Sequence, residues 1–186
     1  IAAAVDGFAA WSRFTVNERA ATMHTLADLI EEHNEEIAHV ECLDMGFLEQ
    51  SMKRRLVSRG ATNFRLYADL IVEHEERHWG AKDMDNRVLR IPAGPAVVIT
   101  PWNAPFMLST WKLAPALAVG NSVIHKPAEW SPLSAAFLAD LANQAGFPPG
   151  AYNLVQGIGD EVGAALVADP RVRRITFTGS PPTARQ

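Results

Sequence analysis

The sequence predicts an α/β fold in which an N-terminal helical segment precedes a parallel sheet with helices on both faces. Apolar residues recur at helical spacing through most of residues 15–75. After residue 95, short apolar runs alternate with helical segments over short connections, which is typical of parallel strands joined by crossover helices. The sheet is therefore expected to be Rossmann-like, and truncated where the sequence stops.

The helical segment begins with a start signal. Thr15-Val16-Asn17-Glu18 has the spacing of a capping box, in which the threonine hydroxyl and the glutamate carboxylate satisfy free backbone N–H groups. Helical spacing then continues to residue 43, and Gly46 supplies a C-terminal stop. A second helical stretch is expected over residues 50–75, with an apolar side that includes Met52.

Residues 80–94 separate the two halves of the chain. Asp83, Asp85 and Asn86 predict a turn, and residues 87–91 alternate in polarity as a strand would. The predicted organisation is a helical part at residues 1–79, a strand or hairpin arm at 80–94 and a Rossmann-like core at 95–186.

The apolar run at residues 96–99 predicts a strand buried on both faces, and further strands are expected at residues 122–125, 152–155 and 174–177. Helices are expected between them, over residues 106–118, 131–144 and 160–167. Ser131-Pro132 is expected to open the second of these helices, as an N-cap followed by proline at the first helical position.

Charge and composition exclude several classes of protein. The formal net charge is −4 and the pI is about 5.9, which argues against nucleic acid as a partner. The short basic run Lys53-Arg54-Arg55 is interpreted as solvated surface, and no apolar run approaches the ~20 residues that span a bilayer. The single cysteine, Cys42, excludes an internal disulfide and favours a cytoplasmic location. The first residue is Ile1 rather than methionine, which suggests a piece of a longer protein.

Unusual residues follow each of the four predicted strands. They are Thr100-Pro101-Trp102-Asn103, Lys126-Pro127-Ala128-Glu129, the glycine-containing run at 157–163, and Thr178-Gly179-Ser180-Pro181. Each alone has an ordinary interpretation, because proline and glycine commonly form turns after strands. In an open parallel sheet, however, all four motifs lie on the edge where ligands bind.

In order and spacing, these four motifs resemble the aldehyde dehydrogenase superfamily, specifically its N-terminal, NAD-binding half. The resemblance covers almost the entire chain. Residues 106–112 and 125–132 look most like the branch of 5-carboxymethyl-2-hydroxymuconate-semialdehyde dehydrogenases, which oxidise an aldehyde formed in the breakdown of aromatic compounds. The resemblance implies NAD as cofactor, a small aldehyde as substrate, and a homodimer or homotetramer built through the arm at 80–94.

The resemblance also implies roles for individual residues. Asn103 corresponds to the asparagine whose amide stabilises the developing oxyanion, although an Asn here could instead cap the following helix. Lys126 and Glu129 correspond to the residues that hold the adenosine ribose. A carboxylate accepts hydrogen bonds from ribose hydroxyls but repels a 2′-phosphate, so Glu129 favours NAD over NADP. Gly159 and Gly163 would let the backbone approach the cofactor closely.

Ser180 is expected at the start of the next helix, where N–H groups suit a pyrophosphate. Pro181, Pro182 and Ala184 depart from the family's pattern there. The remaining expected cofactor contacts are Ile99, Thr100, Pro101, Trp102, Ala128, Phe177 and Gly179.

The family's catalytic cysteine and its general-base glutamate both lie downstream of the Phe-Thr-Gly-Ser motif. Cys42 is a poor substitute, because Glu41 and Asp44 would raise the pKa of its thiol. We therefore expect the 186-residue chain alone to be inactive. Two alternatives remain open: a non-catalytic nucleotide-binding or structural module, and a different nicotinamide oxidoreductase with phosphates at residues 157–163. The scattered histidines predict no metal site.

Overall fold

The computed structural model describes residues 1–185, with the side chains of residues 51–54 left outside the description. Met52, expected on an apolar helix side, and the basic residues Lys53 and Arg54 therefore lie outside the described side chains. The elements in chain order are α1 (Ala2–Trp11), α2 (Val16–Glu32), α3 (Asn34–Met45), α4 (Glu49–Ser51), the π-helical η1 (Met52–Val57), α5 (Ser58–Val72), β1 (His78–Ala81), β2 (Met84–Arg87), β3 (Ala96–Ile99), α6 (Pro105–Ala118), β4 (Val123–Lys126), α7 (Leu133–Gln144), β5 (Tyr152–Leu154), the π-helical η2 (Gly159–Gly163), α8 (Ala164–Ala168), β6 (Arg174–Phe177) and the 3-10 segment η3 (Thr183–Arg185).

The main sheet is parallel, with strand order β5-β4-β3-β6. Along the chain, β4 and β5 are therefore added one after the other on one side of β3, and β6 is then added on the other side of β3. In the register, Ile99 of β3 lies opposite Lys126 of β4 and Phe177 of β6. Such a reversal of strand order leaves a crevice at the carboxyl ends of the two strands where it occurs, here β3 and β6. The predicted Rossmann-like α/β fold is confirmed.

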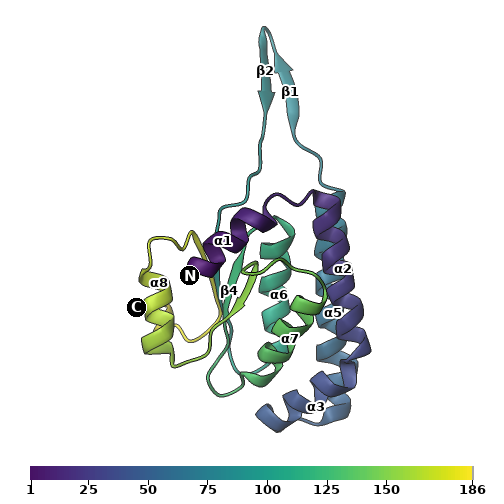
Figure 1. The fold of residues 1–186 in the computed structure, drawn as a ribbon, viewed down its shortest axis with the longest axis vertical. Coiled ribbons are helices and arrows are strands. Elements are labelled where there is room, and N and C mark those ends of the chain that lie inside the picture. The colour runs from purple at the N-terminus through teal and green to yellow at the C-terminus, as the bar shows by residue number, and fades with distance from the viewer. Residues whose placement is uncertain (186) are drawn as a thin grey trace.

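Helices cover both faces of the sheet (Figure 1). On one face, α1 and α8 pack against a small core that includes Val97, Ile124 and Leu166. On the other face, α6 and α7 lie on the sheet and α2 and α5 form an outer layer against α6. Neighbouring strand residues Val97 and Val98 point to opposite faces and belong to the two different cores, as expected for a strand buried on both sides.

The N-terminal helices share the larger core with the sheet. The predicted capping box is confirmed, since Thr15 accepts a hydrogen bond from Glu18 N and the Glu18 carboxylate accepts one from Thr15 N. The helical stretch that follows is two helices, because α2 ends before His33 and α3 begins after it. This break lets α2 pack along α5 while α3 turns toward α7. Gly46, in the left-handed region with φ 69°, ends α3 as expected.

Two long-range hydrogen bonds fasten the N-terminal segment to the end of α6. Trp11 Nε1 donates to Leu117 O over 2.9 Å, and Arg19 Nε donates to Ala118 O over 3.0 Å. Both side chains are buried. The last carbonyls of a helix lack partners within the helix and carry partial negative charge, so a tryptophan N–H and a guanidinium suit this end.

The arm corrects one prediction. A strand was expected at residues 87–91, but the two strands are β1 and β2, paired antiparallel with Ala81 opposite Met84. The turn is therefore Lys82-Asp83, with Lys82 at φ 52°, and Asp85 and Asn86 lie in a strand rather than a turn. Because the hairpin projects from the body (Figure 1), its residues are largely exposed, and burial does not impose the alternation on which the prediction relied.

The start of α7 corrects another prediction. The N-cap of α7 is Pro132 rather than Ser131, and α7 has no side-chain cap of its own. Ser131 Oγ instead donates to Trp102 O over 3.5 Å, so this hydroxyl links two loops at the end of the sheet. Within residues 1–185, no helix is both long enough and apolar enough to cross a membrane.

Candidate cofactor site

All four strand-end motifs follow adjacent parallel strands at one edge of the sheet. Thr100 N donates to Lys126 O and Thr178 N donates to Ile99 O, both over 3.2 Å, which extends the ladder by one residue on each side of β3. The loops after β3, β4 and β6 therefore begin side by side. The motif after β5 follows the strand next to β4. This is the edge at which an open parallel sheet binds ligands.

Lys126 and Glu129 form an ion pair at this edge. Lys126 Nζ lies 3.3 Å from Glu129 Oε2 and also donates to Pro127 O over 3.0 Å. The lysine side chain is only 3% exposed, whereas that of Glu129 is 41% exposed. The backbone N–H of Glu129 and the charge of Lys126 lower the pKa of this carboxyl group against the opposing effect of burial. The pair therefore presents an ionised, solvent-reachable acceptor next to a buried cation, a donor set that fits the hydroxyl groups of a ribose.

The loop between β3 and α6 carries Trp102 and Asn103, both exposed. The N-cap of α6 is Ala104, and α6 has no side-chain cap, so Asn103 does not cap this helix. The alternative interpretation of Asn103 as a capping residue is thus wrong. The Trp102 ring lies 6.4 Å, between centroids, from that of Trp130, which is 74% exposed. Pro101 is half-buried between the exposed loop and the buried Thr100.

A buried polar network that was not predicted from the sequence lies directly next to these loops. His125 is fully buried, with Nε2 3.1 Å from Thr100 Oγ1 and 3.0 Å from Ser109 Oγ. Its Nδ1 lies 2.8 Å from the hydroxyl oxygen of Tyr152. The Ser109 hydroxyl in turn lies 2.6 Å from Pro105 O at the start of α6. The network connects β4, β5, α6 and the first residue of the loop after β3.

The network assigns one tautomer to His125. Burial lowers the pKa of His125 to about 3, so the ring is neutral and has one N–H. The short contact to Pro105 O takes the only proton of Ser109, so Ser109 Oγ accepts from His125 Nε2–H. Nδ1 is then the acceptor, and Tyr152 donates its hydroxyl proton to it. Burial raises the pKa of Tyr152, which keeps this hydroxyl protonated.

The glycines after β5 leave space beside the backbone. No atom from elsewhere in the described residues lies within 4 Å of where a Cβ on Gly159 or Gly163 would stand. Val162, between them, packs with Ile99 on the face covered by α1 and α8. The absence of these two side chains therefore fits the close approach of a ligand to this turn.

The loop after β6 is more exposed. A Cβ on Gly179 would lie 2.4 Å from the Phe177 ring, so glycine is needed there for the ring to keep its place. Ser180 is exposed, and its Oγ accepts from Thr183 N over 3.3 Å. It therefore starts the short segment η3 rather than a long helix within the described residues. Ala128, in the loop after β4, is half-buried and accepts from Ser131 N.

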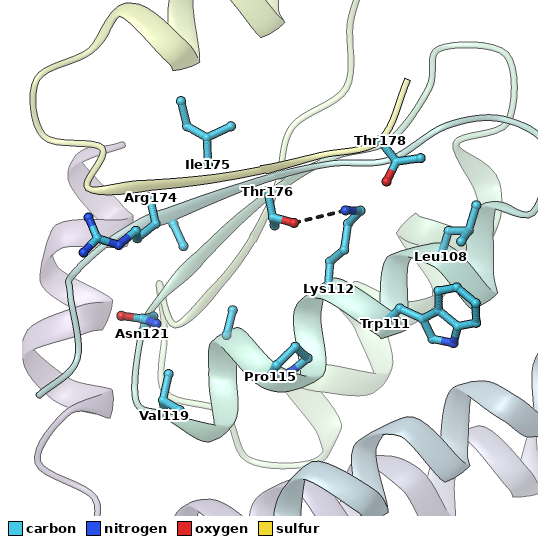
Figure 2. A pocket seen from close by; sticks show the side chains of 12 residues that line it. Leu108, Trp111, Lys112, Pro115, Val119, Asn121, Arg174, Ile175, Thr176 and Thr178 are labelled. Atoms are coloured by element: carbon cyan, nitrogen blue, oxygen red, sulfur yellow. Dashed lines mark hydrogen bonds between the residues drawn. The ribbon is translucent and has the colours of Figure 1, made fainter. Parts of the chain in front are cut away.

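A cavity of about 710 Å³ lies between α6 and β6 and was not predicted from the sequence. It runs along β6 from Arg174 to Thr178, and Figure 2 shows Lys112 crossing it from α6 to donate to Thr176 Oγ1 over 3.0 Å. Partial burial lowers the pKa of Lys112. Trp111 stands at the same end as Thr178, so the cavity meets the strand-end edge that carries the predicted site.

The sequence was compared with models of known protein families to find the family to which this chain belongs. The family model described as "Aldehyde dehydrogenase family" matches residues 1–186 of the chain. The chain belongs to the aldehyde dehydrogenase family. This confirms the resemblance drawn from the strand-end motifs and excludes an unrelated nicotinamide oxidoreductase.

Several relatives of this aldehyde dehydrogenase chain are named as semialdehyde dehydrogenases. It is 40% identical over 191 residues to 2-aminomuconic semialdehyde dehydrogenase of Bos taurus, covering 100% of the chain and 39% of that protein. It is 39% identical over 186 residues to 5-carboxymethyl-2-hydroxymuconate semialdehyde dehydrogenase of Escherichia coli, covering 100% of the chain and 40% of that protein. The second match confirms the expected likeness to that branch.

Solved structures agree with the fold. HpcC from Thermus thermophilus superposes with a TM-score of 0.94 at 47% identity, covering 99% of this chain and 36% of that one. PnpE in complex with nicotinamide adenine dinucleotide superposes with a TM-score of 0.96 at 39% identity, covering 99% of this chain and 38% of that one. The aldehyde dehydrogenase chain thus spans about two fifths of the length of the relatives it matches.

Proposed function

We propose that this chain forms the cofactor-binding part of an NAD-dependent aldehyde dehydrogenase that oxidises an aldehyde to a carboxylic acid. The pair of Lys126 and Glu129 at the sheet edge carries the proposal, because it offers a donor and an acceptor suited to a ribose. Family membership over the whole chain and the NAD complex of PnpE support a nicotinamide dinucleotide. NAD supplies an acceptor for hydride when it is bound.

Glu129 supports NAD rather than NADP. Its carboxyl group has a lowered pKa and remains ionised at neutral pH. An ionised carboxylate accepts hydrogen bonds from the 2′- and 3′-hydroxyls but repels a 2′-phosphate. The buried Lys126 holds the carboxylate from the sheet side. Selectivity for NAD would thus rest on one charge.

The other proposed contacts lie around the same edge. Ser180 would receive the pyrophosphate, and Gly159 and Gly163 would let the backbone approach the cofactor closely, because no side chain fills the space beside them. The lining of the cleft would come from residues that close the strands or follow them: Ile99, Thr100, Pro101, Trp102, Ala128, Phe177 and Gly179.

Asn103 is the residue of this chain proposed to touch the reacting atoms. Its side-chain amide is exposed and is not engaged in capping α6. It can therefore donate to an aldehyde oxygen as negative charge develops on it. The semialdehyde substrates named for the two relatives favour an aldehyde that also carries a carboxylate, as formed when aromatic rings are opened.

The thiol nucleophile of the reaction is proposed to lie outside these residues. Cys42, the single cysteine of the sequence, is half-buried in α3 and packs against the larger core. The 186-residue chain alone should therefore not oxidise aldehydes. One cysteine also fits a reducing compartment, and we place the protein in the cytoplasm.

The projecting arm supports assembly into a homodimer or homotetramer. β1 and β2 pair only with each other and carry Trp79, 51% exposed, and Met84, 65% exposed. A two-stranded ribbon with open edges and exposed apolar side chains is stabilised when another chain covers it. Residues Leu89 and Ile91, which follow the arm, are also exposed.

The test is enzymatic. A protein of the relatives' length that contains this chain should reduce NAD when supplied with a muconic-type semialdehyde, and calorimetry should show tighter binding of NAD than of NADP. No NAD reduction with any aldehyde, together with retained NAD binding, would instead support the alternative of a non-catalytic nucleotide-binding module.

A further inference from the structure

Two helices that follow the site loops start without caps of their own. α6 begins after the loop that carries Asn103, and α7 begins after the loop that follows Lys126 and carries Glu129. Their N-caps are Ala104 and Pro132, neither of which supplies a side-chain hydrogen bond. The first N–H groups of a helix need acceptors from elsewhere.

Both acceptors come from α3. Glu41 Oε2 accepts from Phe106 N over 3.3 Å, and Asp44 Oδ2 accepts from Leu133 N over 2.8 Å. The two carboxylates are three residues apart and lie on one side of the helix. A negative charge at a helix N-terminus also interacts favourably with the helix dipole. One helix of the N-terminal part therefore caps the first turns of both α6 and α7.

We propose that α3 positions the cofactor site, with Glu41 fixing the loop that carries Asn103 and Asp44 fixing the loop that follows Lys126 and carries Glu129. This inference rests on the proposed function of these loops. Phe106 is three residues after Asn103, and Leu133 is four residues after Glu129. A shift of either helix start would move a proposed site residue, and catalysis is sensitive to displacements of about 1 Å.

The surroundings of Glu41 support a specific role rather than incidental burial. Glu41 is fully buried, next to the buried hydroxyl group of Ser134 at the start of α7. Burial raises the pKa of Glu41 to about 7, the charge of Asp44 adds to this, and Ser134 and Phe106 N oppose it. A buried carboxylate is unfavourable unless it is paired. In this structure the Glu41 carboxylate is paired with the backbone N–H of Phe106 at the start of α6.

The test compares two nearly isosteric variants in the complete enzyme. Glu41→Met fills the same space without an acceptor, so the core stays packed, whereas Glu41→Gln keeps an oxygen that can accept from Phe106 N. We expect Glu41→Met to lower kcat about tenfold and to change the NAD dissociation constant by less than about twofold, with Glu41→Gln restoring kcat. Glu36→Met, an exposed position on the same helix that pairs with His33, is the control.

Asp44→Ala should have the opposite pattern, weakening NAD about tenfold while kcat at saturating NAD changes little. Hydrogen exchange of the Phe106 and Leu133 amides gives a readout independent of activity. Faster exchange at Phe106 in Glu41→Met but not in Glu41→Gln supports the proposal. It is overturned if Glu41→Met behaves as Glu36→Met in both assays, or if Glu41→Gln is as impaired as Glu41→Met. A wild-type protein that binds no NAD would refute the proposed function alone, because the exchange measurement still tests α3.

Discussion

Tyr152 donates its hydroxyl proton to Nδ1 of His125 over 2.8 Å, and this hydrogen bond joins β5 to the end of β4. The same imidazole donates through Nε2 to Ser109 at the start of α6. His125 immediately precedes Lys126 in the sequence. The buried imidazole of His125 therefore holds the end of β4 in place, next to Lys126 of the proposed ribose pair.

Tyr152→Phe should destabilise the protein, because it leaves His125 Nδ1 buried without a donor. The expected loss in free energy of unfolding is about 1–3 kcal/mol. Urea denaturation followed by tryptophan fluorescence measures it. Tyr67→Phe is the matched control, since Tyr67 is only partly buried against the core. Equal losses for the two variants would contradict the role given to the Tyr152 hydroxyl.

Glu129→Gln should narrow the preference for NAD over NADP. The substitution removes the charge that repels a 2′-phosphate, and we expect the ratio of the two dissociation constants to fall about tenfold. Calorimetric titration of both cofactors measures the ratio. Glu73→Gln, on the exposed end of α5, should leave it unchanged. An unaltered ratio in Glu129→Gln would remove Glu129 from the ribose site.

Asn103→Ala should impair chemistry in the complete enzyme far more than cofactor binding. Loss of an oxyanion donor lowers kcat by about a hundredfold to a thousandfold. The NAD dissociation constant should change little, because the proposed contact is with the aldehyde oxygen. Asn143→Ala, at an exposed position of α7, serves as control. Normal kcat in Asn103→Ala would show that the amide does not contact the reacting atoms.

Glu41→Gln should change how stability depends on pH. Burial raises the pKa of Glu41 from 4.5 to about 7, so the folded chain holds this proton more tightly than the unfolded chain. The stabilising effect of that proton is full below pH 4.5 and is lost as pH rises through about 7. The loss amounts to about 3 kcal/mol at most. Glu41→Gln cannot ionise and should remove this decline.

The measurement is the free energy of unfolding of both proteins at several pH values between 5 and 8, roughly the range over which the group titrates. The difference between wild type and Glu41→Gln should grow in favour of the variant as pH rises. Parallel curves would mean that Glu41 has the same pKa in the folded and unfolded chains.

Thr15→Ala should cost about 1 kcal/mol of stability, because it removes the hydroxyl that accepts from Glu18 N and half of the capping box. Thr22→Ala tests the specificity of the effect. Thr22 lies in the same helix and its hydroxyl only bonds back to Glu18 O, so its loss should be close to neutral. Thermal unfolding of both variants measures the difference, and equal shifts would argue against a capping role.

Local features were predictable wherever the signal and its partner lie within a few residues. Thr15 and Glu18 are three residues apart, and the predicted capping box is present. The central strands β3 and β4 are buried along almost their whole length, and their apolar residues predicted them. The motifs after β3, β4 and β6 could be placed on one edge because parallel strands all end there. The arm strands were misplaced because exposed residues carry no burial pattern.

The sequence by itself determined the α/β class, the parallel sheet, the family and the chemical types of residue at the strand ends. Only the tertiary structure decided how those residues are held. Glu41 meets Phe106 across 65 positions, Asp44 meets Leu133 across 89, and His125 meets Tyr152 across 27. A side-chain acceptor meets a donor far along the chain wherever packing brings the two together, so such pairs leave no periodicity or spacing in the sequence.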